Sequence, residues 1–409
     1  MAGRGGAGDA AGRIWQPRVR GSLGHVPFGA LYSALTPVVA LLVLAPTEYG
    51  QFSVVYLVAA FGISTQFSLV SEAWLRDGGL LDDTRGAADR YLGAATSCAI
   101  LFGVAGAVAT LVVLGPSPFH LVSGFLAVAF TTYRMSTRYA AVARGQHRRA
   151  VASDLVATGV FVAVLVGAWG SDHLIWTAWA ASSVGAGIVL AVPRIPAGCG
   201  LVAWVREKRR HIGVLLADSA LLDLGSIGVP LILAGLMPAA SFGVYRAVSS
   251  AAMPAGLLLE PMRPTLAHLG PRGLFTVRVL AGLAAAAAAC ALAVWGVLEL
   301  VLPAIGRPAG TLSALVPYAL PTALFVGSFL VGQVAYIVAR GTTGWRGLMT
   351  GRVGQTVAAI VLPIAGFALG GLGGAIWGFV ASAGAAAVIW ILVCRRHAGD
   401  PPGEPSPSR

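Results

Sequence analysis

Apolar stretches of about 20 residues recur along this chain of 409 residues, and they limit its fold more than any other feature. A helix needs about 20 apolar residues to cross the ~30 Å hydrocarbon core of a bilayer. In the first half the stretches are 27–44, 52–75, 91–114, 119–143, 151–169 and 174–192. In the second half they are 212–237, 241–262, 277–302, 311–339, 348–369 and 373–393. The pattern predicts an all-α polytopic membrane protein with twelve transmembrane helices.

Composition excludes a water-soluble protein. The chain is 57% hydrophobic and 11% charged, whereas soluble domains carry about 25% charged residues. Its net charge of +12 would suggest a nucleic-acid partner in a soluble protein. Here the basic residues lie mostly between the apolar stretches, so we expect the lipid bilayer as a partner and no nucleic acid.

The basic residues also orient the chain. With the N-terminus in the cytoplasm, 24 of the 28 basic residues fall in cytoplasmic segments and one, Arg307, falls in an outer loop. This bias follows the positive-inside rule and predicts that both termini are cytoplasmic. Lys208 is the only lysine, which is typical of a GC-rich bacterial genome, and we expect a bacterial inner (plasma) membrane.

The segments outside the apolar stretches are too short to form further domains. Residues 1–26 and 395–409 are polar and are expected to be disordered cytoplasmic tails, and the first has no signal-peptide pattern. The outer loops are only a few residues long, so we expect no extracytoplasmic active site and no enzyme. The four scattered cysteines and the absence of a nucleotide-binding motif predict no metal and no cofactor.

A short corner motif, aromatic-Gly-x-aromatic, occurs twice in the sequence. Tyr49-Gly50-Gln51-Phe52 separates stretches one and two, and Phe242-Gly243-Val244-Tyr245 separates stretches seven and eight, 193 residues later. Because six helices lie between the copies, both halves enter the membrane in the same direction. This predicts two parallel six-helix bundles, 27–193 and 212–394. The basic linker 194–211 between them is either an amphipathic segment at the inner leaflet or a plain loop.

Three segments have the pattern of a known family: "APTEYGQFSVVYLVAAF" (45–61), "YAAVARGQHRRAVASDL" (Tyr139–Leu155) and "ILAGLMPAASFGVYRAVSSAAMP" (Ile232–Pro254). They resemble bacterial polysaccharide flippases of the multidrug/oligosaccharidyl-lipid/polysaccharide exporter superfamily. The resemblance implies a flippase that moves a polyprenyl-(pyro)phosphate-linked oligosaccharide from the inner to the outer leaflet by alternating access. The loop "GGLLDDTRGAADR" is similar to a major facilitator motif, but its register fails by one residue.

Charged residues inside the stretches are the candidate site, because each costs about 2.5–3.5 kcal/mol on insertion scales and by default faces a cavity or a partner. Arg246 lies one turn inside stretch eight, where the first half has Ser53. A guanidinium binds phosphate oxygens bidentately and stays protonated, so Arg246 is predicted to bind the anionic head of the substrate. The alternative is that it reaches the outer headgroups or pairs with an acid.

Arg134 and Arg138 are four residues apart and share one helix face. They are predicted to bind substrate as a basic entry path for inner-leaflet phosphates. Alternatively, their helix protrudes into the cytoplasm and the two arginines anchor it.

Three carboxylates complete the candidate set. Glu72 ends a polar stripe with Thr65 and Ser68, predicted to face the substrate path, although Arg76 at i+4 offers a local ion pair. Asp218, and less so Asp223, is a candidate for coupling to a proton or sodium gradient, the alternative being a pair with an arginine. Five residues separate these two aspartates, which places them about 140° apart on a helix, so no single carboxylate pair is expected.

These features favour a flippase for a lipid-linked glycan that serves surface polysaccharide export. One alternative is a cation-coupled exporter of drugs or small molecules. Another is a non-catalytic membrane scaffold of cell-wall assembly.

Overall fold

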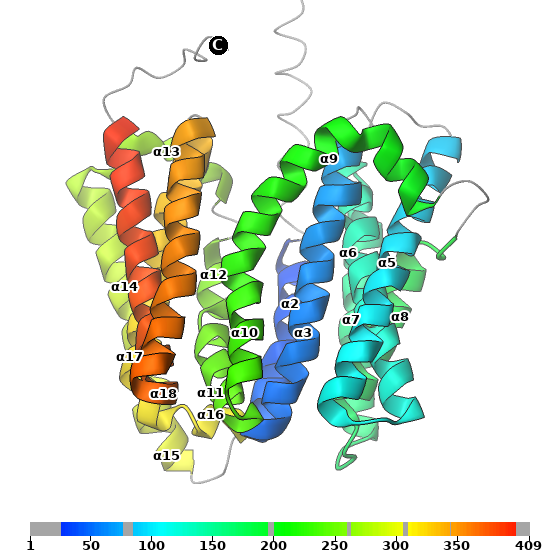
Figure 1. Cartoon of the computed structure of the whole chain (residues 1–409), viewed down its shortest axis with the longest axis horizontal. Coiled ribbons are helices and arrows are strands. Elements are labelled where there is room, and N and C mark those ends of the chain that lie inside the picture. Colours follow the sequence, from blue (N-terminus) through cyan, green and yellow to red (C-terminus); the bar gives the residue numbers. More distant parts are fainter. Residues whose placement is uncertain are drawn as a thin grey trace, which may run out of the picture. The chain divides into compact units, whose positions relative to one another are not determined.

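The computed structural model describes residues 26–76, 85–194, 200–259, 263–305, 310–343 and 345–397. Every regular element among these residues is helical, and no strand occurs in them (Figure 1). The all-α fold class predicted from the apolar stretches is therefore confirmed.

Each predicted apolar stretch coincides with a helix. In the first half the elements are α2 (Val26–Val43), α3 (Pro46–Gln66), η2 (Phe67–Ser71), α4 (Glu72–Arg76), α5 (Arg85–Leu114), α6 (Pro118–Ala143), α7 (His147–Gly167) and α8 (Leu174–Leu190). In the second half they are α9 (Leu201–Asp223), η3 (Leu224–Gly228), α10 (Val229–Leu236), α11 (Ala239–Ser250), α12 (Met253–Leu259), α13 (Arg263–Leu274), α14 (Val277–Gly296), η4 (Val297–Val301), α15 (Leu302–Ile305), α16 (Gly310–Ser313), η5 (Val316–Tyr318), α17 (Ala319–Thr342) and α18 (Trp345–His397).

Within the described residues, seven helical stretches are long and apolar enough to cross a membrane. The last of them, Arg346–His397, has 52 residues and so the length of two crossings, each of which takes about 20 residues. A kink at Gly370 and Gly371 divides it, and Gly371 has a φ of 57°. That backbone conformation is open to glycine and strained for other residues, so the last two predicted spans are separated by a glycine turn.

Three of the long helices contain a turn of π-helix, at η2, η3 and η4. A π turn inserts one residue into the α-helical register and so changes which side chains share a face. The polar stripe predicted from Thr65, Ser68 and Glu72 runs across η2, where α-helical spacing no longer applies.

The chain divides into two compact units, and the division cuts across the sequence halves. Among the described residues, unit 1 contains 26–36 and 58–216, and unit 2 contains Pro37–Leu57 and the residues from Ala217 onward. The first corner therefore belongs to the same unit as the second corner. The helices α2, α3 and α9 each continue from one unit into the other. The predicted bundle boundaries near residue 200 stay a prediction.

Within each unit, the helices pack against one another. In unit 1, α6 packs against α5 and α8, and α8 packs against α7 (Figure 1). In unit 2, α17 packs against α18, α14 and α13. Small residues such as Ala335, Ala339 and Cys394 are buried around Trp390, so the helices approach closely there.

The predicted linker is helical where the structure describes it. Residues 195–199 lie outside the described residues, and α9 begins at Leu201. Trp204 is buried in unit 1, and its Nε1 donates a hydrogen bond of 2.8 Å to the carbonyl oxygen of Leu69. Lys208 lies over the Trp204 ring, with Nζ 5.2 Å from its centroid. The described part of the linker is thus helical, and its position at the inner leaflet stays a prediction.

Candidate functional site

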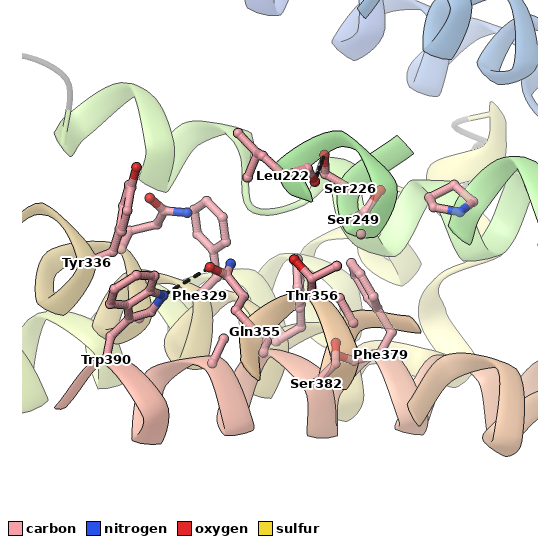
Figure 2. Close-up of a pocket in the computed structure, with 18 of the residues that line it drawn as sticks. Leu222, Ser226, Ser249, Phe329, Tyr336, Gln355, Thr356, Phe379, Ser382 and Trp390 are labelled. Carbon is pink, nitrogen blue, oxygen red and sulfur yellow. Dashed lines mark hydrogen bonds between the residues drawn. The ribbon is translucent and has the colours of Figure 1, made fainter. Parts of the chain in front are cut away.

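Unit 2 contains an open cavity of about 310 Å³ lined by side chains of α9 to α12, α17 and α18 (Figure 2). This volume lies at the lower end of the range of about 300–1,000 Å³ typical of ligand pockets. The wall combines phenylalanine rings with hydroxyl and amide groups and two arginines, Arg246 and Arg352. A cavity with these walls fits an anion that also carries an apolar or ring-shaped part.

Arg246 lies in the second turn of α11, seven residues after the helix begins at Ala239. Its Nε is buried and has no hydrogen-bond partner among the described residues. No ion pair within 4.0 Å joins its guanidinium to a carboxylate in that part of the chain. A buried donor without a partner is costly, so this geometry leaves hydrogen-bonding capacity for a ligand oxygen.

The hydroxyl groups that follow Arg246 are partly used by the helix itself. Ser249 Oγ and Ser250 Oγ donate to the carbonyl oxygen of Arg246, at 2.7 and 3.1 Å. Both serines line the cavity, but Ser250 Oγ also lies 2.8 Å from Tyr49 Oη, so Ser249 Oγ has the larger remaining acceptor capacity.

Arg352 is the second cation of the cavity wall and is only 5% exposed. Its Nη2 donates to Tyr336 Oη at 2.7 Å, and its guanidinium carbon lies 4.7 Å from the centroid of that ring. Gln355 Oε1 accepts from Arg352 Nη1 at 3.4 Å. It also accepts from Trp390 Nε1 at 3.0 Å (Figure 2). These contacts fix the guanidinium on one side of the cavity.

Sequence reasoning missed Arg352 as a site residue. It lies four residues inside stretch eleven, close to the basic loop, and is one of the 24 basic residues counted with the cytoplasmic segments. The available signal was its position inside an apolar stretch, which is the same signal that identified Arg246.

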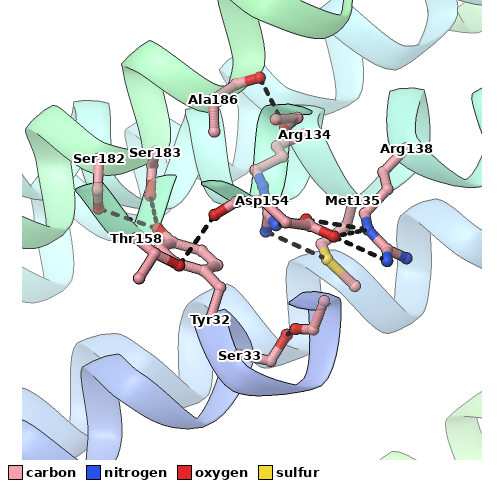
Figure 3. A network of polar contacts seen from close by, with 12 residues as sticks. Tyr32, Ser33, Arg134, Met135, Arg138, Asp154, Thr158, Ser182, Ser183 and Ala186 are labelled. Carbon is pink, nitrogen blue, oxygen red and sulfur yellow. Dashed lines mark hydrogen bonds and ion pairs between the residues drawn. The ribbon is translucent and has the colours of Figure 1, made fainter. Parts of the chain in front are cut away.

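Unit 1 holds the other two candidate arginines in a buried ion-pair network (Figure 3). Arg134 Nη2 pairs with Asp154 Oδ1, and Arg138 Nη2 lies 2.9 Å from Asp154 Oδ2. Asp154 is fully buried and Arg134 is 1% exposed. The side chain of Arg138 also lies against Gly29 of α2, because a Cβ at that glycine would meet its guanidinium. Two helices, α6 and α7, are thus joined through one carboxylate.

Hydroxyl groups extend this network. Tyr32 lies over Arg134, with the guanidinium carbon 4.3 Å from its ring centroid, and its Oη is 3.0 Å from Ser182 Oγ. Thr131 Oγ1 lies 2.9 Å from Ser183 Oγ and accepts from Trp179 Nε1 at 2.9 Å. The sequence analysis placed Arg134 and Arg138 on one helix face but did not identify Asp154 as their partner. Asp154 comes 16 residues after Arg138 and lies on the next helix. A role of the two arginines in substrate binding stays a prediction.

Of the acidic candidates whose side chains the structure describes, neither Glu72 nor Asp223 lines the cavity. Glu72 begins α4 in unit 1 and is partly exposed, and no ion pair within 4.0 Å joins it to Arg76. Asp223 is 7% exposed and ends α9, next to the cavity residue Leu222. Asp218 lies within α9, and its side chain is outside the described part. Coupling at either aspartate stays a prediction.

The described residues contain no cluster of three or more histidine, cysteine, aspartate or glutamate side chains that would hold a metal ion. Cys98, Cys290 and Cys394 are free thiols.

Several solved structures share the fold of the chain. The inward closed conformation of the lipid II flippase MurJ has a TM-score of 0.60 at 10% identity, covering 91% of this chain and 86% of that one. The inward-facing conformation of a multidrug resistance MATE family transporter of the MOP superfamily has a TM-score of 0.57 at 14% identity, covering 90% and 94%. The bent form of the Vibrio cholerae MATE transporter VcmN has a TM-score of 0.50 at 12% identity, covering 93% and 96%.

No protein-family profile matches the sequence, and no curated protein matches it. The structural likeness spans almost the whole chain at low identity and shows the fold. This likeness confirms the fold that the resemblance of the three sequence segments implies.

Proposed function

We propose that the chain is a flippase that moves a polyprenyl-(pyro)phosphate-linked oligosaccharide from the inner to the outer leaflet of a bacterial plasma membrane. In this proposal both termini are cytoplasmic and the exported glycan serves a surface polysaccharide. The observation that carries the proposal is the cavity of unit 2, where Arg246 has a buried and unpartnered Nε among the described residues. The fold supports a transporter of the same general plan as the lipid II flippase MurJ.

The roles of the residues follow from their surroundings. The Arg246 guanidinium donates to the phosphate oxygens of the lipid-linked head. Arg352 is held against Tyr336 and Gln355 and adds a second positive charge at a fixed position. Gln333 and Gln355 line the same cavity and offer amide groups to sugar hydroxyls. Coupling to a proton or sodium gradient through Asp218 or Asp223 is part of the proposal.

The test is translocation of a lipid-linked oligosaccharide by the purified protein in proteoliposomes. Arg246→Ala is expected to reduce transport at least tenfold, because a charge-assisted hydrogen bond contributes about 1.5–3 kcal/mol. Arg246→Lys keeps the charge but loses the bidentate geometry, so it is expected to lie in between. The matched control is Arg278→Ala, which removes an exposed arginine of α14. Unchanged transport by Arg246→Ala would remove the assigned role.

A second candidate is an exporter of small molecules, because a MATE family transporter shares the fold. Arginines in the cavity wall disfavour cationic cargo by like-charge repulsion, so this exporter would carry neutral or anionic compounds. Competition separates the two candidates: a small anionic compound that is itself transported and blocks glycan transport would favour the exporter.

A further inference from the structure

The side-chain amide of Gln355, in the wall of the cavity, is held in one orientation. Its Oε1 accepts from two groups that can only donate, Trp390 Nε1 at 3.0 Å and Arg352 Nη1 at 3.4 Å. If the amide were turned over, its Nε2 would face both donors, and neither could bond to it. The amide oxygen therefore faces Trp390, and Nε2 is the group left for a ligand (Figure 2).

The indole ring that sets this orientation is itself fixed by its neighbours. Trp390 is 1% exposed, and a Cβ on Gly351, in the first half of α18, would come within 2.6 Å of the ring. The Tyr336 ring packs against it, with the two ring centroids 5.0 Å apart. The N–H bond of Trp390 thus points in one direction, toward the amide oxygen of Gln355.

The hydroxyl group of Tyr336 is also restricted to donating. Its Oη accepts from Arg352 Nη2 at 2.7 Å and from Arg340 Nη1 at 3.3 Å. Because a hydroxyl oxygen has two lone pairs, both are occupied, and only the O–H hydrogen is left for a ligand. Tyr336 and Gln355 both line the cavity, so each of them offers it a hydrogen-bond donor.

These contacts give one end of the cavity a single hydrogen-bonding character. In Figure 2, Tyr336 and Trp390 lie at one end, with the Gln355 amide oxygen turned toward Trp390, and Ser249 lies at the other. The side-chain oxygens of Gln355 and Tyr336 are occupied, and Arg352, bonded to both, adds a positive charge. A ligand oxygen that only accepts and carries negative charge fits this end, whereas an ammonium group does not.

We propose that Gln355 is the specificity-determining residue of this end of the cavity, where its locked Nε2 selects an oxyanion of the ligand. The oxyanion is a phosphate oxygen of the lipid carrier or the carboxylate of an acidic sugar. The proposal rests on the proposed function for the identity of the cargo. Gln333 then remains as the amide for sugar hydroxyls.

The test measures ligand binding to the purified full-length protein by isothermal titration calorimetry. The probes are inorganic pyrophosphate, glucuronate and glucosamine, which carries an ammonium group. Gln355→Glu keeps an acceptor oxygen for Trp390 and Arg352 and replaces only the NH₂ group, by a carboxylate oxygen. The matched control is Gln333→Glu, which puts the same charge on the same cavity wall without replacing a locked donor.

Gln355→Glu is expected to weaken anion binding at least tenfold, because a donor to a charged oxygen is lost and a like charge takes its place. Gln333→Glu adds only the charge, so it is expected to weaken binding less than about threefold. The probe that loses affinity identifies the source of the oxyanion. Pyrophosphate stands for the lipid phosphate, and glucuronate stands for the sugar carboxylate.

Trp390→Phe tests the orientation of the amide. It removes one of the two donors that hold Oε1, so the amide is free to turn over and present its oxygen to the cavity. We expect the anion to bind about two- to fivefold more weakly and glucosamine to bind more tightly. If Trp390 had only a structural role, its replacement would lower both affinities.

Equal losses in Gln355→Glu and Gln333→Glu would overturn the proposal, and so would a parent protein that binds neither anion. Translocation of the lipid-linked oligosaccharide by the parent protein separates this result from the fate of the proposed function. Glycan transport, with no effect of Gln355→Glu on anion binding, would refute the role of Gln355 alone. Anion binding that depends on Gln355, without glycan transport, would refute the proposed function alone.

Discussion

At the residue scale, the role of a buried charge depends on its partners. Arg134 and Arg138 share the carboxylate of Asp154, which ties α6 to α7. Arg246 has no such carboxylate among the described residues, and its Nε is unpartnered there. The first arrangement holds the fold together, and the second keeps a donor available for a ligand.

Asp154→Asn tests the first arrangement. It leaves two arginines facing a neutral amide, and breaking a buried pair costs about 3–5 kcal/mol. We expect the free energy of unfolding in detergent to fall by about this amount. Asp172→Asn is the control, because Asp172 is exposed in the loop after α7. Equal stability of the two variants would mean that the network contributes nothing to folding.

Arg246→Ala tests the second arrangement, for which no loss of stability is expected. Removing a buried donor that lacks a partner relieves a desolvation cost, so we expect the apo protein to be as stable as the parent or more stable. Thermal unfolding without ligand measures this. A large loss of stability would show that Arg246 is a structural residue.

At the scale of elements, backbone irregularities decide which side chains share a face. The π turns at η2, η3 and η4 interrupt three helices that the sequence presents as uniform apolar stretches. Asp223 directly precedes η3. Leu222 before it and Gly225 and Ser226 after it line the cavity. The glycine turn in α18 is the other irregularity, and it converts one long helix into two.

The glycine turn offers a matched pair of substitutions. Gly371 has a φ of 57° and Gly370 a φ of −145°, and a Cβ at either position meets nothing within 4 Å. Gly371→Ala is expected to lower the free energy of unfolding by roughly 1–3 kcal/mol through backbone strain. Gly370→Ala is expected to change it by less than about 0.5 kcal/mol. Equal effects would contradict the assigned turn conformation.

At the scale of the whole molecule, local signals were predictable and tertiary pairings were not. Apolar length located the helical stretches of the described residues, because bilayer thickness sets it directly. The repeated corner identified Gly50 and Gly243 as equivalent residues. Nothing in the sequence indicated that they touch, or that Pro37–Leu57 joins the second unit. Asp154 was not predicted as a site residue because its two partners lie on another helix. Arg352 was not predicted because a charge near a loop has the pattern of a charge that anchors a helix end at the membrane surface.

The predicted orientation is tested by labelling at both ends of the helices. Asp172→Cys lies in the loop between α7 and α8, and Arg346→Cys at the start of α18, and both positions are exposed. In a cysteine-free background, an impermeant maleimide is expected to label Asp172→Cys in intact cells. It is expected to label Arg346→Cys only in inverted vesicles. The reverse pattern would place both termini outside.

The most direct test of the central claim compares two cargoes in the same proteoliposomes. One is a fluorescent oligosaccharide on a polyprenyl diphosphate, and the other is a cationic dye. The arginine-lined cavity predicts that the glycan reaches the opposite leaflet at a rate well above that of protein-free vesicles, while the dye does not move. Transport of the dye with no movement of the glycan would contradict the account.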